Sequence, residues 1–214
     1  MKTNVYVDGF NLYYRVKRTP YRWLDIAKLC EVMLPQNEIH RIRYFTARVI
    51  NPPDDPHVLD RQQIYLRALR TIPNLSIHYG QFIRNPVRMP LVNPRPNGPR
   101  TVEVWKTEEK GSDVNLACYM LLDAFKHEYE VAVVISNDSD LKEPIKIVRR
   151  EFNLRVVVLH PVLPPQHGRK MTLSVELSHV ATKSLIIEDA HLAQSQFPPQ
   201  MQDQHGTITK PEKW

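Results

Sequence analysis

Short apolar runs that alternate with helical patterns are the feature that most constrains the fold of this chain. We predict buried strands at 3–7 and 131–135, where the sequence is rich in β-branched residues. Segments 58–72 and 114–125 carry apolar residues at helical spacing. Strands that are apolar on both faces and separated by helices form parallel sheets covered on either side. The sequence therefore predicts a three-layer α/β fold, with a central, mostly parallel sheet flanked by helices.

The chain length and the distribution of prolines suggest how the chain is divided. A length of 214 residues suits one domain with a sizeable core. We predict that this domain spans 1–190 and carries a proline- and arginine-rich insertion at 85–99. The insertion contains five prolines, and we predict a loop there. The segment 191–214 is polar and interrupted by prolines, and is predicted to be a mobile tail.

The composition argues against a membrane-spanning protein, a secreted protein and a zinc-binding protein. No apolar run approaches the ~18 residues of a membrane span, and the first residues lack the apolar core of a signal peptide. Cys30 and Cys118 have no metal-site spacing, so we expect free thiols and a cytoplasmic location. The net charge of +6 favours a polyanionic partner. The lack of a long apolar run leads us to expect no membrane association.

Four aspartates lie where elements of the predicted sheet begin or end. Asp8 follows the first apolar run, Asp138 and Asp140 follow a later one, and Asp113 begins a helix. Because parallel strands end at one edge of a sheet, we expect these carboxylates to gather there. Two such charges repel by roughly 4 kcal/mol at an effective dielectric constant of about 20. The sequence therefore predicts a bound cation, and oxygen ligands favour Mg²⁺ or Mn²⁺ over zinc.

Ordinary structural roles compete with metal binding for these residues. Asp8 could be a turn residue, and Asn11 could cap the following helix or orient Asp8. Asp113 could cap its own helix, and Asp140 could form a capping box with Glu143. Both interpretations stay open for each residue.

Two expectations follow from the helix positions. Pro144 belongs to the first turn of a helix, so that helix begins near 140–143 and Asp138 lies too early to cap it. Asp123 lies off the inward stripe of its helix, and we expect it to be solvated.

Basic residues gather in two segments that lack acids. The segment 84–102 interleaves arginines with prolines, and the segment 9–24 interleaves basic residues with tyrosines and a tryptophan. Cationic and aromatic side chains together suit a flexible single strand of nucleic acid. Tyr13 and Trp23 could instead belong to the core, and Lys110 could simply be solvated. The candidates for nucleic-acid binding are Arg15, Arg18, Arg84, Arg88, Arg95, Arg100 and Lys110.

Three motifs together resemble the NYN domain family of the PIN-like nuclease superfamily, and its LabA-like branch in particular. The resemblance spans roughly 3–190 and implies a PIN-like fold, a Mg²⁺ or Mn²⁺ site and hydrolysis of RNA phosphodiester bonds. The chain departs from many relatives at Asn137, where they have glycine, and in its insertion at 85–99. The motifs are Tyr6-Val-Asp-Gly-Phe-Asn-Leu-Tyr13, Lys110-Gly-Ser-Asp-Val-Asn-Leu-Ala117 and Val134-Ile-Ser-Asn-Asp-Ser-Asp-Leu-Lys-Glu-Pro144. On the resemblance, Asp8, Asp113 and Asp138 match the metal-site acids, Asp140 matches a further acid, and Asn11 and Ser136 match supporting polar positions.

The leading hypothesis is a metal-dependent ribonuclease acting on RNA that is single-stranded or has exposed loops. The alternative is a catalytically weak RNA-binding or regulatory module on the same fold, and a homo-oligomer is compatible with either. An aspartyl phosphatase is disfavoured, because Phe10 occupies the place of the second acid. A dinucleotide-binding enzyme is disfavoured, because Gly-x-Gly-x-x-Gly is absent.

Overall fold

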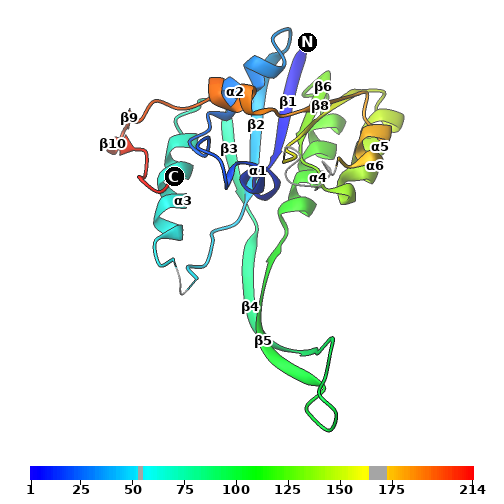
Figure 1. Ribbon diagram of the computed structural model, residues 1–214. Helices are drawn as coiled ribbons and strands as arrows, with labels where there is room; N and C mark the ends of the chain where they lie inside the picture. Colours follow the sequence, from blue (N-terminus) through cyan, green and yellow to red (C-terminus); the bar gives the residue numbers. More distant parts are fainter. Residues whose placement is uncertain (53–54, 164–172) are drawn as a thin grey trace.

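The computed structural model describes residues 1–52, 55–163 and 173–214. Its centre is a six-stranded sheet in the order β3-β2-β1-β6-β7-β8, and every pairing in it is parallel (Figure 1). The predicted α/β fold with a central parallel sheet is confirmed. The strands of this sheet are β1 (Lys2–Asp8), β2 (Glu38–Thr46), β3 (Leu75–Tyr79), β6 (Val131–Ile135), β7 (Arg155–His160) and β8 (Lys183–Ile186).

Helices cover both faces of the sheet. One layer holds α1 (Gly9–Val16), α2 (Ile26–Met33), α3 (Val58–Leu69) and α7 (Asp189–Gln194). The other holds α4 (Ser112–Phe125), α5 (Lys142–Glu151) and α6 (Val175–Val180), with a 3₁₀ turn, η1 (Ser139–Leu141), before α5. Side chains alternate along each strand, so Val5 and Val7 enter one core while Tyr6 enters the other. No helix in the described ranges is both long and apolar enough to cross a membrane.

A buried ion pair ties α4 to the sheet. The Asp123 carboxylate on α4 accepts two hydrogen bonds of 2.8 Å from the Arg43 guanidinium on β2 and one of 2.8 Å from the Tyr6 hydroxyl on β1. Asp123 is only 1% exposed. The expectation that Asp123 is solvated is therefore wrong. The helix pattern could not show that a cation 80 positions away would compensate a buried acid.

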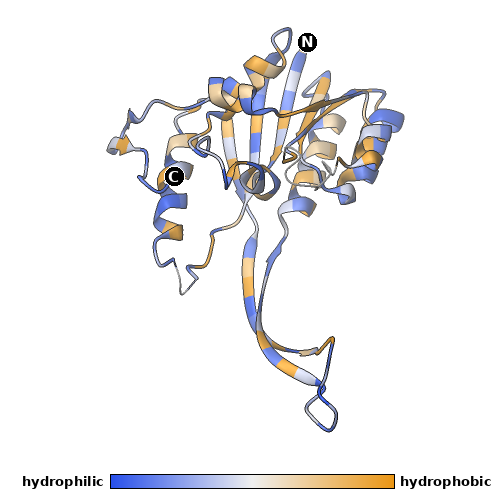
Figure 2. Cartoon of the chain, viewed as in Figure 1, coloured by the Kyte–Doolittle hydropathy of each residue, from blue (hydrophilic) through white to orange (hydrophobic). Residues whose placement is uncertain are grey.

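A two-stranded antiparallel hairpin projects from the body of the molecule, and we call residues 81–110 the arm (Figure 1). It consists of β4 (Gln81–Pro90) and β5 (Thr101–Lys110). The predicted loop at 85–99 is wrong for its first part, because β4 continues to Pro90. Proline lacks a donor but is tolerated on an edge strand, and both strands of a two-stranded ribbon are edges. Hydrophobic and hydrophilic residues are interspersed along the arm (Figure 2).

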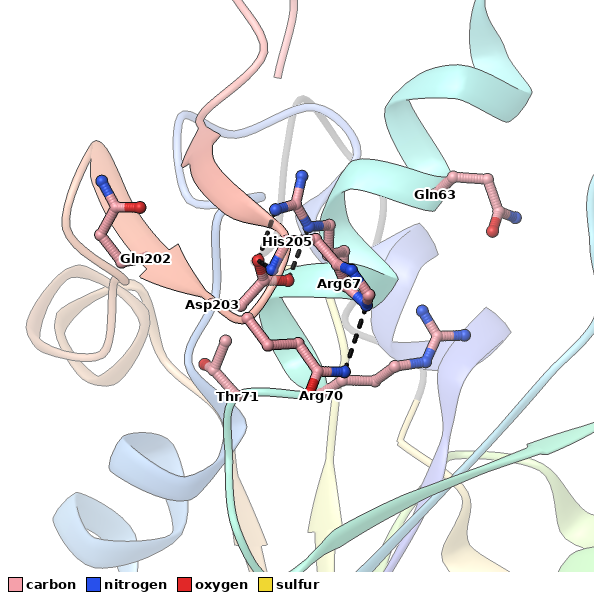
Figure 3. Close-up of a pocket in the computed structure, with 8 residues that line it drawn as sticks. Gln63, Arg67, Arg70, Thr71, Gln202, Asp203 and His205 are labelled. Atoms are coloured by element: carbon pink, nitrogen blue, oxygen red, sulfur yellow. Dashed lines mark hydrogen bonds and ion pairs between the residues drawn. The ribbon is translucent and has the colours of Figure 1, made fainter.

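The C-terminal segment is also ordered against the body, contrary to the predicted mobile tail. It forms β9 (Gln200–Asp203) and β10 (Gly206–Thr209) beside α3. Phe197 and Ile208 are buried, and the Phe197 ring lies 5.9 Å from that of Trp23. Asp203 accepts a 2.6 Å hydrogen bond from Arg67 Nε on α3 (Figure 3). A few well-spaced apolar residues suffice to dock a segment whose average composition is polar.

Candidate active site

Of the four aspartates predicted to meet, Asp8, Asp138 and Asp140 lie at or after the carboxyl ends of β1 and β6, and Asp113 lies in the first turn of α4. The strand order changes direction between β1 and β6, and open α/β sheets bind ligands at such a point. Asp8 is the last residue of β1, and Asp138 lies three residues after β6. The charges of Asp8, Asp138 and Asp140 all act to raise the pKa of Asp113, so the four carboxyl groups are in electrostatic reach of one another.

Asp8 is the most buried of the four and is held by a network of hydrogen bonds. Its Oδ2 accepts from Asn11 Nδ2 at 2.6 Å and from Ser136 Oγ at 2.8 Å. Its Oδ1 accepts from the backbone amides of Phe10 and Asn11, so Asp8 itself caps α1. Burial is the largest influence on Asp8 and raises its pKa, while these donors act in the opposite direction. The Asn11 side chain orients Asp8 rather than capping the helix.

The turn after β6 connects Asp8 to the next acid. Ser136 Oγ donates to Asp8 and accepts from the backbone amide of Asp138 at 3.0 Å. Asp138 Oδ1 accepts from the amide of Asp140 at 3.0 Å and caps η1. Asp138 does not cap α5, as expected, but it does cap the 3₁₀ turn that precedes that helix. That α5 begins near 140–143 is confirmed, with Lys142 as its first residue.

Asp140 is exposed in the 3₁₀ turn, and its capping box with Glu143 does not form. No side chain caps α5, and Glu143 instead pairs with Lys146 at 2.6 Å. The capping role expected for Asp140 is therefore not observed, and its charge acts on Asp113 less than those of Asp8 and Asp138 do.

Asp113 lies in the first turn of α4. The sequence patterns did not reveal the residue that caps this helix, which is Glu109. Glu109 accepts from the Ser112 backbone amide at 3.1 Å and from Ser112 Oγ at 2.7 Å, and so takes the place of a capping side chain. Gly111 precedes the helix with a φ of 99°, which favours glycine. Burial and then the neighbouring acids, Asp8 first, raise the pKa of Asp113 to about 6.

Replacing Asp113 by asparagine is expected to stabilise the metal-free protein. The pKa of Asp113 is higher in the folded protein, at about 6, than in the unfolded chain, at about 4. The free energy of unfolding therefore falls as pH increases between these two values. At neutral pH that loss is complete, so Asp113→Asn should raise the free energy of unfolding by about 1 kcal/mol after allowance for solvent screening. Urea denaturation in EDTA at pH 5 and pH 7.5 measures it. A stabilisation that did not grow with pH would contradict the proximity of the acids.

The oxygen atoms at the acidic edge are of the kind that bind a hard divalent cation. Asp8 supplies carboxylate oxygens and Ser136 a hydroxyl oxygen at this edge, and Mg²⁺ and Mn²⁺ prefer oxygen ligands. Within the described residues, however, no group of three or more His, Cys, Asp and Glu residues is arranged so that it could hold an ion. Mg²⁺ usually keeps several waters and binds proteins through one or two carboxylates. The geometry therefore fits a hydrated ion better than a closed cage of protein ligands.

Arg15, predicted to bind nucleic acid, has a structural role instead. Its side chain is buried, and Nη2 donates to the Asp189 carboxylate and to the Ile187 carbonyl oxygen. It therefore anchors the end of the domain and is not available to a polyanion. Trp23 is likewise in the core, whereas Arg18 is exposed.

The arginines of the arm are exposed, and the base of the arm reaches the acidic edge. The Arg84 guanidinium lies 4.9 Å from the centroid of the Trp105 ring, and Arg88 Nε lies 3.9 Å from a Glu103 oxygen. Phe82 at the base packs edge-on against Phe10, with ring centroids 5.5 Å apart. The arm leads directly into α4, which carries Asp113. Arg95 and Arg100 are exposed in the connection, and exposed Lys110 lies 3.7 Å from Glu108 at the end of β5.

A cavity of about 780 Å³ lies between α3 and the β9–β10 hairpin, away from the four aspartates of the acidic edge (Figure 3). Its carboxylate, Asp203, is paired with Arg67, which lowers the pKa of Asp203 to about 2. Because these opposite charges satisfy each other, we assign this cavity to the docking of the C-terminal hairpin.

The sheet order, the two helical layers and the acidic edge define a protein of the PIN-like class. The NYN domain model matches residues 2–187, so this chain belongs to the NYN domain family, as its motifs predicted. A crystal structure of a protein of unknown function from Vibrio parahaemolyticus has a TM-score of 0.56 at 16% identity, covering 92% of this chain and 96% of that one. The chain is also 30% identical over 240 residues to 6-hydroxy-3-succinoylpyridine 3-monooxygenase HspA of Pseudomonas putida, covering 100% of this chain and 75% of HspA.

Proposed function

We propose that the protein is a ribonuclease that hydrolyses RNA phosphodiester bonds with Mg²⁺ or Mn²⁺ at the acidic edge. The observation that carries this proposal is the proximity of Asp113 to the other acids: burial raises its pKa most, and the charges of Asp8, Asp138 and Asp140 act in the same direction. Such a concentration of negative charge at a ligand-binding edge is costly without a cation. Membership of the NYN domain family, whose fold is of the nuclease type, supports the same reading.

Asp8, Asp113 and Asp138 would hold a hydrated ion, in part through bound water, because the described acids do not form a direct three-residue cage. Asp140 would lie at the rim. The ion would supply an acidified water and neutralise charge on the scissile phosphate. Asn11 and Ser136 are positioning residues, because each donates to the same Asp8 oxygen and fixes the direction of its free lone pairs.

The arm is the part of the chain that would hold the RNA strand. Arg84, Arg88, Arg95 and Arg100 can contact phosphates, and the exposed Trp105 ring, stacked with Arg84, can receive a base. Lys110 and Arg18 would extend this surface toward the acidic edge. A flexible single strand suits such a narrow, protruding element better than a rigid duplex does.

The proposal is tested with end-labelled single-stranded RNA in Mn²⁺, in Mg²⁺ and in EDTA, with a DNA strand of the same sequence as a second substrate. We expect RNA cleavage that requires the metal. Tight RNA binding without cleavage in any of these conditions would favour the regulatory module instead.

Substitution of two arginines of the arm is expected to weaken the binding of RNA by the same factor whatever the nucleotide sequence of the RNA. Each phosphate contact on a single strand contributes about 0.7 to the slope of log K against log salt. The Arg88→Gln/Arg95→Gln variant should therefore lower that slope by about 1.4, measured by fluorescence anisotropy between low and moderate salt. Arg150→Gln, an exposed arginine on α5, is the control. An unchanged slope would remove the arm from the binding surface.

A second candidate function is oxygenation of a small heteroaromatic compound. It is favoured by the likeness to HspA, which extends over the whole of this chain. The test is oxygen consumption with 6-hydroxy-3-succinoylpyridine and a reduced nicotinamide donor, with product identified by mass spectrometry. Substrate-dependent oxygen uptake without RNA cleavage would establish this candidate over the nuclease.

A further inference from the structure

We propose that a cavity beside the acidic edge binds a planar aromatic ring that carries an anionic group. The cavity has a volume of about 600 Å³ and is lined by residues of α1, the end of β2, α3 and the base of the arm. Small-molecule sites have volumes of about 300–1,000 Å³. Gly9 and Phe10, which directly follow Asp8, form part of its wall. The proposal goes beyond the nuclease function, since it holds whichever reaction occurs at the acids.

Aromatic side chains line the cavity from several elements. Phe10 and Phe82 form an edge-to-face pair, and the rings of Tyr13 and Tyr14 lie 5.8 Å apart. The ring of Tyr14 is largely apolar, yet this residue is 63% exposed. Planar rings stack on such aromatic surfaces with little dependence on the identity of the ring.

The charges around the cavity are mostly positive. Lys17, Arg18, Arg22 and Arg61 line it, and Asp55 is the one carboxylate among the described lining residues. Asp55 pairs with Arg61. Arg22 Nη1 donates to the Lys213 carbonyl oxygen at 3.0 Å. In the described ranges neither Lys17 nor Arg18 has an ion-pair partner, and Lys17 Nζ lies 5.8 Å from the centroids of the Tyr13 and Tyr14 rings. The uncompensated cations therefore lie beside the aromatic wall.

The ring of Tyr44 lies between the cavity and Asp8. A Cβ at Gly9 would lie 2.8 Å from Tyr44 Cζ, so glycine allows the Tyr44 ring to pack directly against the start of α1. Burial raises the pKa of Tyr44, and the Asp8 charge acts in the same direction. A ligand in the cavity therefore lies one side chain away from Asp8. A nucleotide of an RNA strand and a free heteroaromatic acid both have the required chemistry.

Isothermal titration calorimetry on the whole chain in EDTA tests the proposal. The probes are adenosine 5′-monophosphate, uridine 5′-monophosphate and pyridine-3-carboxylate, with adenosine and pyridine-3-carboxamide as uncharged counterparts. We expect at least one anionic probe to bind, about tenfold or more tighter than its uncharged counterpart. Lys17→Gln/Arg18→Gln should weaken that binding about tenfold, and Tyr14→Ala should also weaken it. Arg150→Gln and Phe125→Ala, which change an exposed arginine and an exposed aromatic ring elsewhere, should not.

Competition identifies the source of the ligand. Displacement of the bound probe by single-stranded RNA would assign the cavity to a nucleotide of the strand. A pyridine-3-carboxylate complex that RNA does not displace would assign it to a free acid. Binding of none of the probes at about 5 mM, equal binding of the uncharged counterparts, or unchanged affinity in a folded Lys17→Gln/Arg18→Gln variant would overturn the proposal. RNA cleavage is measured separately on the same preparations, so loss of one property does not imply loss of the other.

Discussion

Asp8→Asn is expected to reduce metal-dependent RNA cleavage about 10³-fold, because loss of a buried carboxylate removes several kcal/mol of stabilisation of the ion and the transition state. The fold should be retained. Asparagine keeps one acceptor oxygen for the amides of Phe10 and Asn11, and it removes a charge whose burial raises the pKa of Asp8. Single-turnover cleavage per folded molecule is the measurement, with circular dichroism as the check on folding.

Asp60→Asn is the matched control for this variant, since the Asp60 side chain is 69% exposed and lies on α3, away from the acidic edge. It should cleave at the wild-type rate. Cleavage by folded Asp8→Asn at the wild-type rate would show that Asp8 only caps α1.

Asp123→Ala is expected to destabilise the protein by about 3 kcal/mol, because it leaves the guanidinium of Arg43 without its carboxylate in the interior. The Arg43 side chain is only 12% exposed, and Tyr6 loses its acceptor at the same time. Urea unfolding measures the change in the free energy of unfolding.

The double variant Asp123→Ala/Arg43→Met provides the comparison. It should be more stable than the single variant, because no unpaired charge remains buried. A loss below about 0.5 kcal/mol in Asp123→Ala, as for an ordinary surface position, would contradict the structural role of this ion pair.

The parts of the fold that local sequence determines could be predicted. The apolar run at 131–135 is buried at every position as β6, and the acids that follow β1 and β6 come together because parallel strands end at one edge. These inferences need only residue periodicity and the topology of a parallel sheet.

The errors concern residues whose environment is made by distant segments. Arg15 is paired with Asp189, 174 positions away, and Asp123 with Arg43, 80 positions away, so neither could be recognised as buried from its own helix. Glu109 is a different case, because its hydrogen bonds to Ser112 are local but depend on the conformation of the turn between β5 and α4. The prolines predict a loop at 85–99 because prolines are rare in sheets, although the edge strands of a ribbon admit them.

The most direct test of the account is anomalous X-ray scattering from crystals soaked in Mn²⁺. The account predicts an anomalous peak at the carboxyl end of β1, bound to Asp8 and to at least one of Asp113 and Asp138, directly or through a bound water. That peak should be missing in Asp8→Asn crystals soaked in the same way. A wild-type crystal with bound Mn²⁺ only at other surface carboxylates, and none at this edge, would contradict the claim that these acids share an ion.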